Sequence, residues 1–100
     1  MSTVIEYTMR VKHGQYDRVM EAYVAFADRF GEINPTEDLI LVTGDRDNGL
    51  IRGIGVFESK SEAEAVVGVD IFEAFRTDVA DFLVGAPERS ELELVHTFVK

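Results

Sequence analysis

The chain contains no cysteine and no tryptophan, and basic residues are scarce beside acidic ones. Without cysteine it forms neither disulfides nor thiolate metal sites. Ten Lys and Arg against 19 Asp and Glu give a formal net charge of −9, which disfavours nucleic-acid phosphates and anionic membrane surfaces as partners. No apolar run approaches the roughly 20 residues that span a bilayer, and the opening MSTVIEYTMR lacks the zones of a signal peptide. We therefore expect a cytoplasmic protein without nucleic-acid or membrane partners.

Hydrophobic residues make up 46% of the 100 residues, as in a globular protein. This length suits one small core, so we expect residues 1–100 to form a single domain. Period-2 alternation predicts strands, and i, i+3, i+4 spacing predicts helices. The predicted strands span residues 4–12, 39–44, 50–58 and 91–99. The predicted helices span residues 15–30, which Gly31 should end, and 59–83, with an interruption at Gly68.

This order of elements, strand–helix–strand–strand–helix–strand, is the βαββαβ pattern of the ferredoxin-like α+β fold. Its antiparallel sheet carries both helices on one face. Several of the predicted strands are apolar on both faces, and two helices can cover only one of them. We therefore predict a homodimer in which two sheets pack together.

Local signals support the boundaries of these elements. Asn48-Gly49 is a hairpin-turn dipeptide between the second and third strands. Ser59 has a glutamate three residues later, as in a helix capping box, and Ser61 offers the same spacing. Gly53 and Gly55 lie on one face of the third strand, where glycine often marks the close approach of another backbone or a ligand.

Four stretches of the chain resemble one known group of proteins. They are MRVKHGQYDRVMEAY, VFESKSEAEA, FEAFRTDVADFLVGAPE and LELVHTFV. Together they resemble the dimeric α/β-barrel proteins related to the antibiotic biosynthesis monooxygenases. The resemblance implies small homodimers, some of which oxidise aromatic quinols or anthrones with dioxygen and no added cofactor, while others degrade haem.

The residues of this chain do not match those of the haem-degrading members of the group. Those members use an Asn in the first strand, a Trp, and a His in the second helix, and all three are missing here. We therefore expect no haem, no metal and no other cofactor. The resemblance implies a cofactor-independent monooxygenase acting on a small quinol-like or polyketide-like aromatic. The alternatives are a non-catalytic dimer that binds a small ligand, and a cyclase or isomerase on the same fold.

His96 is the candidate catalytic residue. In a strand of alternating side chains it shares a face with Leu92, Leu94 and Phe98, and we expect that face to meet the helices. A histidine has an ordinary pKa of about 6.5 and can act as a base near neutral pH. A packed core histidine with one hydrogen bond would give the same pattern, because a buried polar group must find a partner.

Five residues are predicted to line a pocket for a flat aromatic ligand. They are Tyr7 and Met9 of the first strand, Tyr23 of the first helix, and Phe72 and Phe75 of the last helical stretch. The alternative is that the same side chains simply form the core of the domain.

Overall fold

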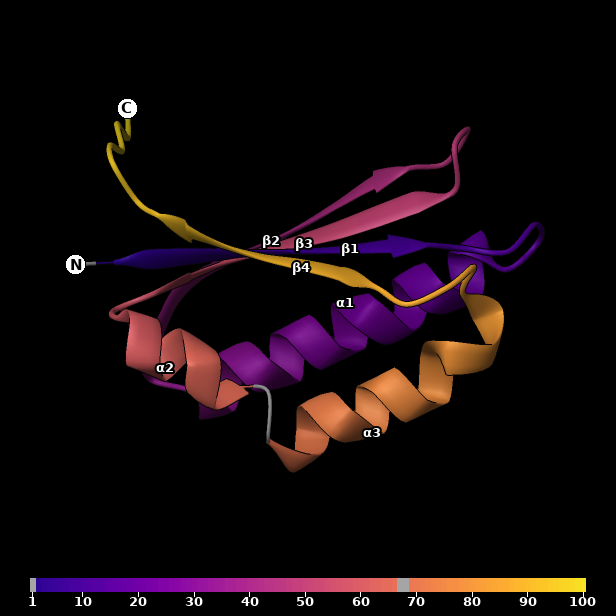
Figure 1. The fold of residues 1–100 in the computed structure, drawn as a ribbon, viewed down its shortest axis with the longest axis horizontal. Helices are drawn as coiled ribbons and strands as arrows, with labels where there is room; N and C mark the ends of the chain where they lie inside the picture. The colour runs from indigo at the N-terminus through magenta and orange to yellow at the C-terminus, as the bar shows by residue number, and fades with distance from the viewer. Residues whose placement is uncertain (1, 67–68) are drawn as a thin grey trace.

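The computed structural model describes residues 2–66 and 69–100. Figure 1 labels the helices and strands, whose bounds are as follows: β1 Thr3–Arg10, α1 Tyr16–Ile33, β2 Glu37–Asp45, β3 Leu50–Phe57, α2 Lys60–Ala65, α3 Asp70–Val79, a short 3₁₀ helix η2 Ala80–Phe82, and β4 Glu88–Glu93. The interruption predicted at Gly68 lies outside the described residues. Within them, no helix is both long enough and apolar enough to cross a membrane.

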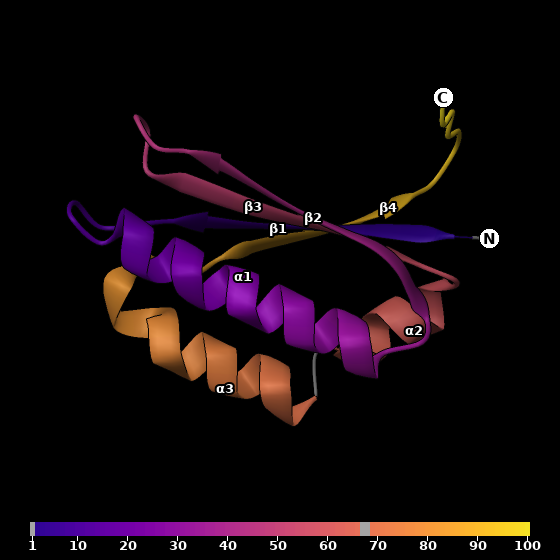
Figure 2. The same cartoon turned by 180° about the vertical axis from the view of Figure 1, so that it is seen from behind.

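The four strands form one antiparallel sheet in the order β2-β3-β1-β4. All three α-helices lie on the same face of this sheet, and the other face carries no helix (Figures 1 and 2). The predicted ferredoxin-like α+β fold is therefore confirmed. We call the uncovered side the open face.

The alternation of β1 and the apolar stripe of α1 build the core between sheet and helices. In β1, Tyr7 and Met9 point to the helices and are buried, whereas Arg10 is exposed. The residues of α1 that face the sheet recur every three or four positions: Val19, Tyr23, Ala27 and Phe30. Such a stripe buries apolar surface on one side of a helix and leaves the charged side in water.

Two helix boundaries can be traced to individual residues. α1 continues through Gly31 and ends at Ile33, and the backbone N–H of its C-cap, Asn34, donates to the Phe30 carbonyl at 3.0 Å. Pro35 is the cause, because the residue before a proline is driven out of the helical region, so the predicted stop at Gly31 was wrong. The predicted cap at Ser59 is confirmed: its hydroxyl accepts the Glu62 N–H at 3.2 Å and begins α2.

β4 differs most from its prediction. It spans Glu88–Glu93 and not residues 91–99, and its register pairs Tyr7 with Arg89 and Val4 with Leu92. Leu92 therefore lies on the open face, opposite to its predicted side. The register reaches the start of β1 at Glu93, after which β4 has no further length of β1 to pair with. Residues 95–100 form no strand and rise from the sheet on the side away from the helices (Figures 1 and 2).

Val19 and Val24 of α1 provide a direct test of this packing. Val19 is fully buried against the sheet, whereas Val24 is 43% exposed. Val19→Ala removes two buried carbons and leaves a cavity, so we expect the free energy of unfolding to fall by about 2 kcal/mol. Val24→Ala should change it by no more than about 0.5 kcal/mol. Urea denaturation of both variants measures the difference, and equal losses would contradict the burial pattern.

Candidate functional site

A mainly apolar cavity, partly open to solvent, lies between the sheet and the helices. Its volume is about 60 Å³, and its walls come from β1, α1, β2, β3, α2, α3 and β4. Aromatic rings form much of the lining: Tyr7 meets Phe72 edge-on at 5.6 Å between centroids, and Tyr23 stacks on Phe26 at 6.0 Å. Four lining residues carry strongly polar or charged groups: Tyr7, Tyr23, Glu37 and Arg89.

Two glycines of β3 make room for two of these polar groups. A Cβ at Gly53 would overlap the Tyr23 hydroxyl, and a Cβ at Gly55 would overlap a carboxylate oxygen of Glu37. The groups that approach β3 are thus side chains of this chain, and not the second backbone or the ligand that the sequence suggested. The two glycines let a phenol and a carboxyl group rest on the surface of the sheet.

The phenols of Tyr7 and Tyr23 stay neutral at physiological pH. Burial raises the pKa of Tyr7, and the positive charge of Arg76 opposes that rise only in part. Burial also raises the pKa of Tyr23, with smaller contributions from Tyr7 and Glu37. The Tyr7 hydroxyl is buried and no described group forms a hydrogen bond of good geometry with it, but the guanidinium of Arg76 lies near enough to lower its pKa as a donor. The Tyr7 hydroxyl oxygen thus faces a possible donor, while its own hydrogen stays free to donate.

Glu37, at the start of β2, brings an ionisable group into the same apolar space. Burial raises the pKa of its carboxyl group to about 7, because the cavity solvates the charged form poorly. Its Oε1 atom is buried and meets no hydrogen-bond donor in the described part of the chain. Near neutral pH, Glu37 is thus a poised acceptor of hydrogen bonds and of protons.

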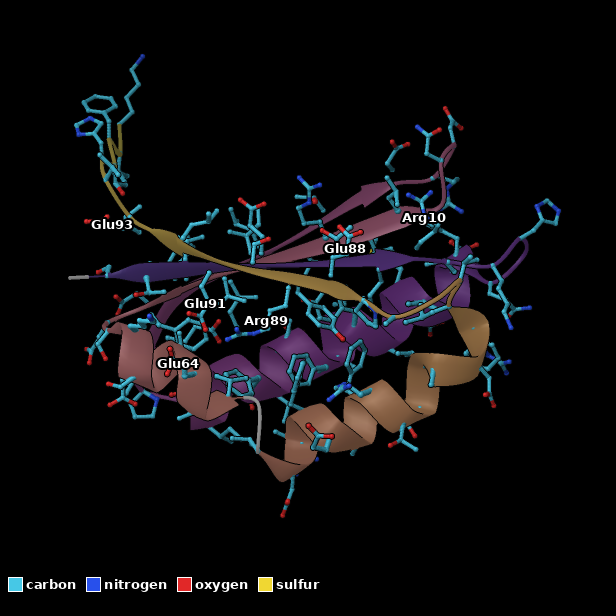
Figure 3. The ribbon with its side chains drawn as sticks, in the orientation of Figure 1. Arg10, Glu64, Glu88, Arg89, Glu91 and Glu93 are labelled. Carbon is cyan, nitrogen blue, oxygen red and sulfur yellow. The ribbon has the colours of Figure 1, made fainter. Side chains whose placement is uncertain are left out.

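Arg89 faces the helices from β4 and closes one end of the cavity (Figure 3). Its guanidinium donates to Glu91 Oε1 at 2.8 Å and to the Ala63 carbonyl at 3.1 Å. Ala63 lies in the last turn of α2, where carbonyls lack helical partners and favour a cation. Arg89 therefore fastens α2 to β4 while its positive charge stays beside the cavity.

A second, more open cleft adjoins the cavity at Tyr7. It has a volume of about 350 Å³ and lies between α3 and residues 83–87. Tyr7 belongs to the walls of both spaces, so its ring separates the inner cavity from the outer cleft. Arg76 and Glu73 of α3, which pair at 3.3 Å, give the cleft a charged rim.

The structure brings three of the five predicted pocket residues into the wall of the cavity: Tyr7, Tyr23 and Phe72. Met9 is fully buried in the core and does not line the cavity. Phe75 stacks on Tyr23 at 5.1 Å and supports the wall from behind.

His96 does not occupy its predicted place. It lies past the end of β4, is exposed, and lines none of the cavities described above. The expected position on the helix-covered face was wrong for the physical reason given above: the pairing of β4 with β1 ends before residue 96.

Glu37 and Arg89 were not among the residues predicted for the site. A charged side chain in a strand is normally assigned to solvent, and both residues sit near strand ends. For Arg89 the sequence did contain a signal, because charged residues at 89, 91 and 93 alternate with Ser90 and Leu92. If the strand begins at Glu88, this alternation places the three charged residues on one face of β4. The described residues contain no group of three or more His, Cys, Asp or Glu arranged to hold a metal ion.

Comparisons with known proteins relate the chain to others through its fold. No protein-family model matches its sequence, and no curated protein does. A candidate antibiotic biosynthesis monooxygenase from Caulobacter crescentus CB15 superposes with a TM-score of 0.85 at 17% identity, over 95% of this chain and 91% of that one. SnoaB, a cofactor-independent oxygenase from Streptomyces nogalater solved as a mutant, gives 0.80 at 14% identity, over 99% and 98%. The chain thus has the fold of the group that its sequence resembles.

Replacing Glu37 should change how stability depends on pH. Because its pKa of about 7 in the folded state lies above the unfolded value of 4.5, the folded state binds the proton more tightly. The stability that the folded state gains from this tighter proton binding is complete below pH 4.5 and is lost as pH rises through 7. Glu37→Gln should remove that loss, so its free energy of unfolding should exceed the wild-type value at pH 8 by about 1 kcal/mol, because Glu37 is only half-buried and solvent screens part of the penalty.

Urea denaturation at pH 5 and pH 8 measures this effect. Asp38→Asn is the matched control, because Asp38 is the exposed neighbour of Glu37 in β2. The control should follow the wild type at both pH values. A Glu37→Gln curve parallel to the wild type between pH 5 and pH 8 would contradict a raised pKa.

Proposed function

We propose that this protein is a cofactor-independent monooxygenase that oxidises a small aromatic hydroxyl compound of the quinol class with dioxygen. The observation that supports this most is the small cavity between sheet and helices, whose aromatic walls carry neutral phenols and one ionisable carboxyl group. Aromatic walls suit a flat ring, and the polar groups suit its hydroxyls. The fold shared with SnoaB supports the same function by analogy.

The size of the cavity limits how such a ligand binds. An engineered cavity of about 150 Å³ holds benzene, whereas the inner cavity here has about 60 Å³. A whole ring therefore enters only if a wall side chain moves. Tyr7 is the side chain whose displacement would join the inner cavity to the outer cleft of about 350 Å³.

The cyclase or isomerase alternative rested on His96 as the base at the site. In a single chain His96 lies outside the cavity, so the cyclase or isomerase alternative no longer has a candidate base at the site. The non-catalytic ligand-binding alternative differs from the oxygenase in one measurable respect: ligand would bind without dioxygen being consumed.

Oxygen uptake with a panel of mono- and bicyclic quinols, in the presence of a chelator and without flavin or nicotinamide, tests the proposal. Ala27→Leu fills the cavity from α1 and should lower uptake at least tenfold. Ala25→Leu makes the same change on the exposed side of the same helix and should leave it unchanged. Thermal melting checks that both variants fold. Quinol binding without uptake would favour the ligand-binding alternative.

We further propose that two copies pack through their open faces. The open face carries an apolar patch of six residues: Val4, Leu39, Leu41, Ile54, Val56 and Leu92. Three of them are 44–48% exposed in the single chain. The tail of residues 95–100 lies on the same side, and its Val95, Phe98 and Val99 are more exposed still. His96 belongs to this tail, so any role for it in a site would depend on the second copy.

Sedimentation equilibrium at micromolar concentration measures this association. We expect a dimer for the wild type and a monomer for Leu41→Glu, because a charge within the patch would be desolvated on packing. Val24→Glu places the same charge on the exposed side of α1 and should leave the dimer intact. A monomeric wild type would contradict the proposal.

A further inference from the structure

The cavity contains a buried donor and a buried acceptor that do not satisfy each other. The Tyr7 hydroxyl and Glu37 Oε1 both lack partners among the described residues, and both residues line the same space. An unpaired buried polar atom is costly, and few survive in folded proteins unless something binds them. The cavity thus has one hydrogen-bond donor and one acceptor that a ligand could use.

A hydroxyl group on a ligand has the matching chemistry. Its O–H can donate to a carboxylate oxygen while its oxygen accepts from a phenol. A ligand that can only accept hydrogen bonds, such as an aromatic ether, would leave the carboxylate unpaired. With about 60 Å³ available, the hydroxyl-bearing edge of a ring is the part that reaches the inner cavity.

We propose that Glu37 is the group in this cavity that accepts the hydroxyl hydrogen of a bound phenol or quinol. This deepens the function proposed above and rests on it for the ligand class. When Glu37 is ionised, it can also take the proton outright. The ligand O–H bond then breaks, its electron pair stays on the ligand oxygen, and Glu37 becomes a neutral acid.

Gly55 shows that the position of the carboxyl group is built into the sheet. A Cβ at this residue would take the place of the Glu37 Oε2 atom. Every other inward position of β3 except Gly53 carries a side chain, so the niche is specific to this carboxyl group. Glu37 therefore approaches the cavity from a fixed place beside the β3 backbone.

The other charged and titratable groups around the cavity do not compete for this role between pH 5.5 and 8.5. Tyr7 from β1 and Tyr23 from α1 have raised pKa values and stay neutral. Arg89 from β4 is paired with Glu91, and Arg76 from α3 is paired with Glu73. A pH-dependent change in ligand recognition over this range would therefore report on Glu37.

Phenol and anisole form a probe pair that isolates the hydroxyl hydrogen. Phenol, with a pKa of about 10 like tyrosine, stays neutral over this range, so any pH dependence comes from the protein. Dissociation constants from NMR titration at pH 5.5 and 8.5 give the preference for phenol over anisole. We expect this preference to rise about tenfold in the wild type, because a charged acceptor strengthens the hydrogen bond.

In Glu37→Gln the preference should no longer change with pH, whereas Asp38→Asn should behave as the wild type does. Gly55→Ala, which displaces the carboxyl group without removing it, should also abolish the change and serves if Glu37→Gln folds poorly. The phenol-induced shifts should include the Gly55 amide. A constant preference in the wild type, an unchanged rise in Glu37→Gln, or shifts that avoid the cavity would overturn the proposal.

Oxygen uptake separates the two proposals. If the phenol preference behaves as expected but no quinol supports uptake, the oxygenase function fails while the role of Glu37 in recognition stands. If uptake occurs and Glu37→Gln retains both its rate and its pH profile, Glu37 is not the acceptor and the oxygenase function stands.

Discussion

The close approach of Tyr23 and Glu37 to the backbone of β3 is the constraint on which the rest of this structure depends. Gly53 and Gly55 have no Cβ, so a phenol and a carboxyl group lie directly on the sheet where other strands carry side chains. Close packing elsewhere leaves few voids in a core of this size. The cavity exists because polar groups occupy these two places and cannot fill the remaining space as tightly as apolar side chains would.

The parts of the fold that follow from the sequence are those in which only one face of an element is apolar. β1 alternates cleanly, so Tyr7 and Met9 were placed correctly on the helix side, and the stripe of α1 was equally clear. The predicted fourth strand, residues 91–99, has apolar residues at both parities, so hydrophobicity alone could not choose its face. Its hydrogen-bond register with β1 decided the matter, and a register depends on both strands at once.

The site was predictable in its aromatic walls but not in its charges. Aromatic residues at helical and strand spacing identify a core whether or not a cavity opens within it, and Tyr7, Tyr23 and Phe72 were found in this way. Glu37 and Arg89 violate the expectation that charged residues face water. Arg89 is tolerated because it pairs with Glu91 and with a carbonyl of α2, which are contacts that only the folded chain creates.

Apart from the guanidinium of Arg89, which is paired with Glu91, the cavity holds two kinds of polar group, and they respond differently to pH. The phenols are neutral over the whole physiological range, so their donor capacity is fixed. The carboxyl group of Glu37 changes charge near pH 7, so the acceptor strength of the cavity varies while its shape and its donors do not. A ligand held only by aromatic contacts would not sense this change. A ligand with a hydroxyl hydrogen would, because its interaction with Glu37 changes from a neutral to a charge-assisted hydrogen bond.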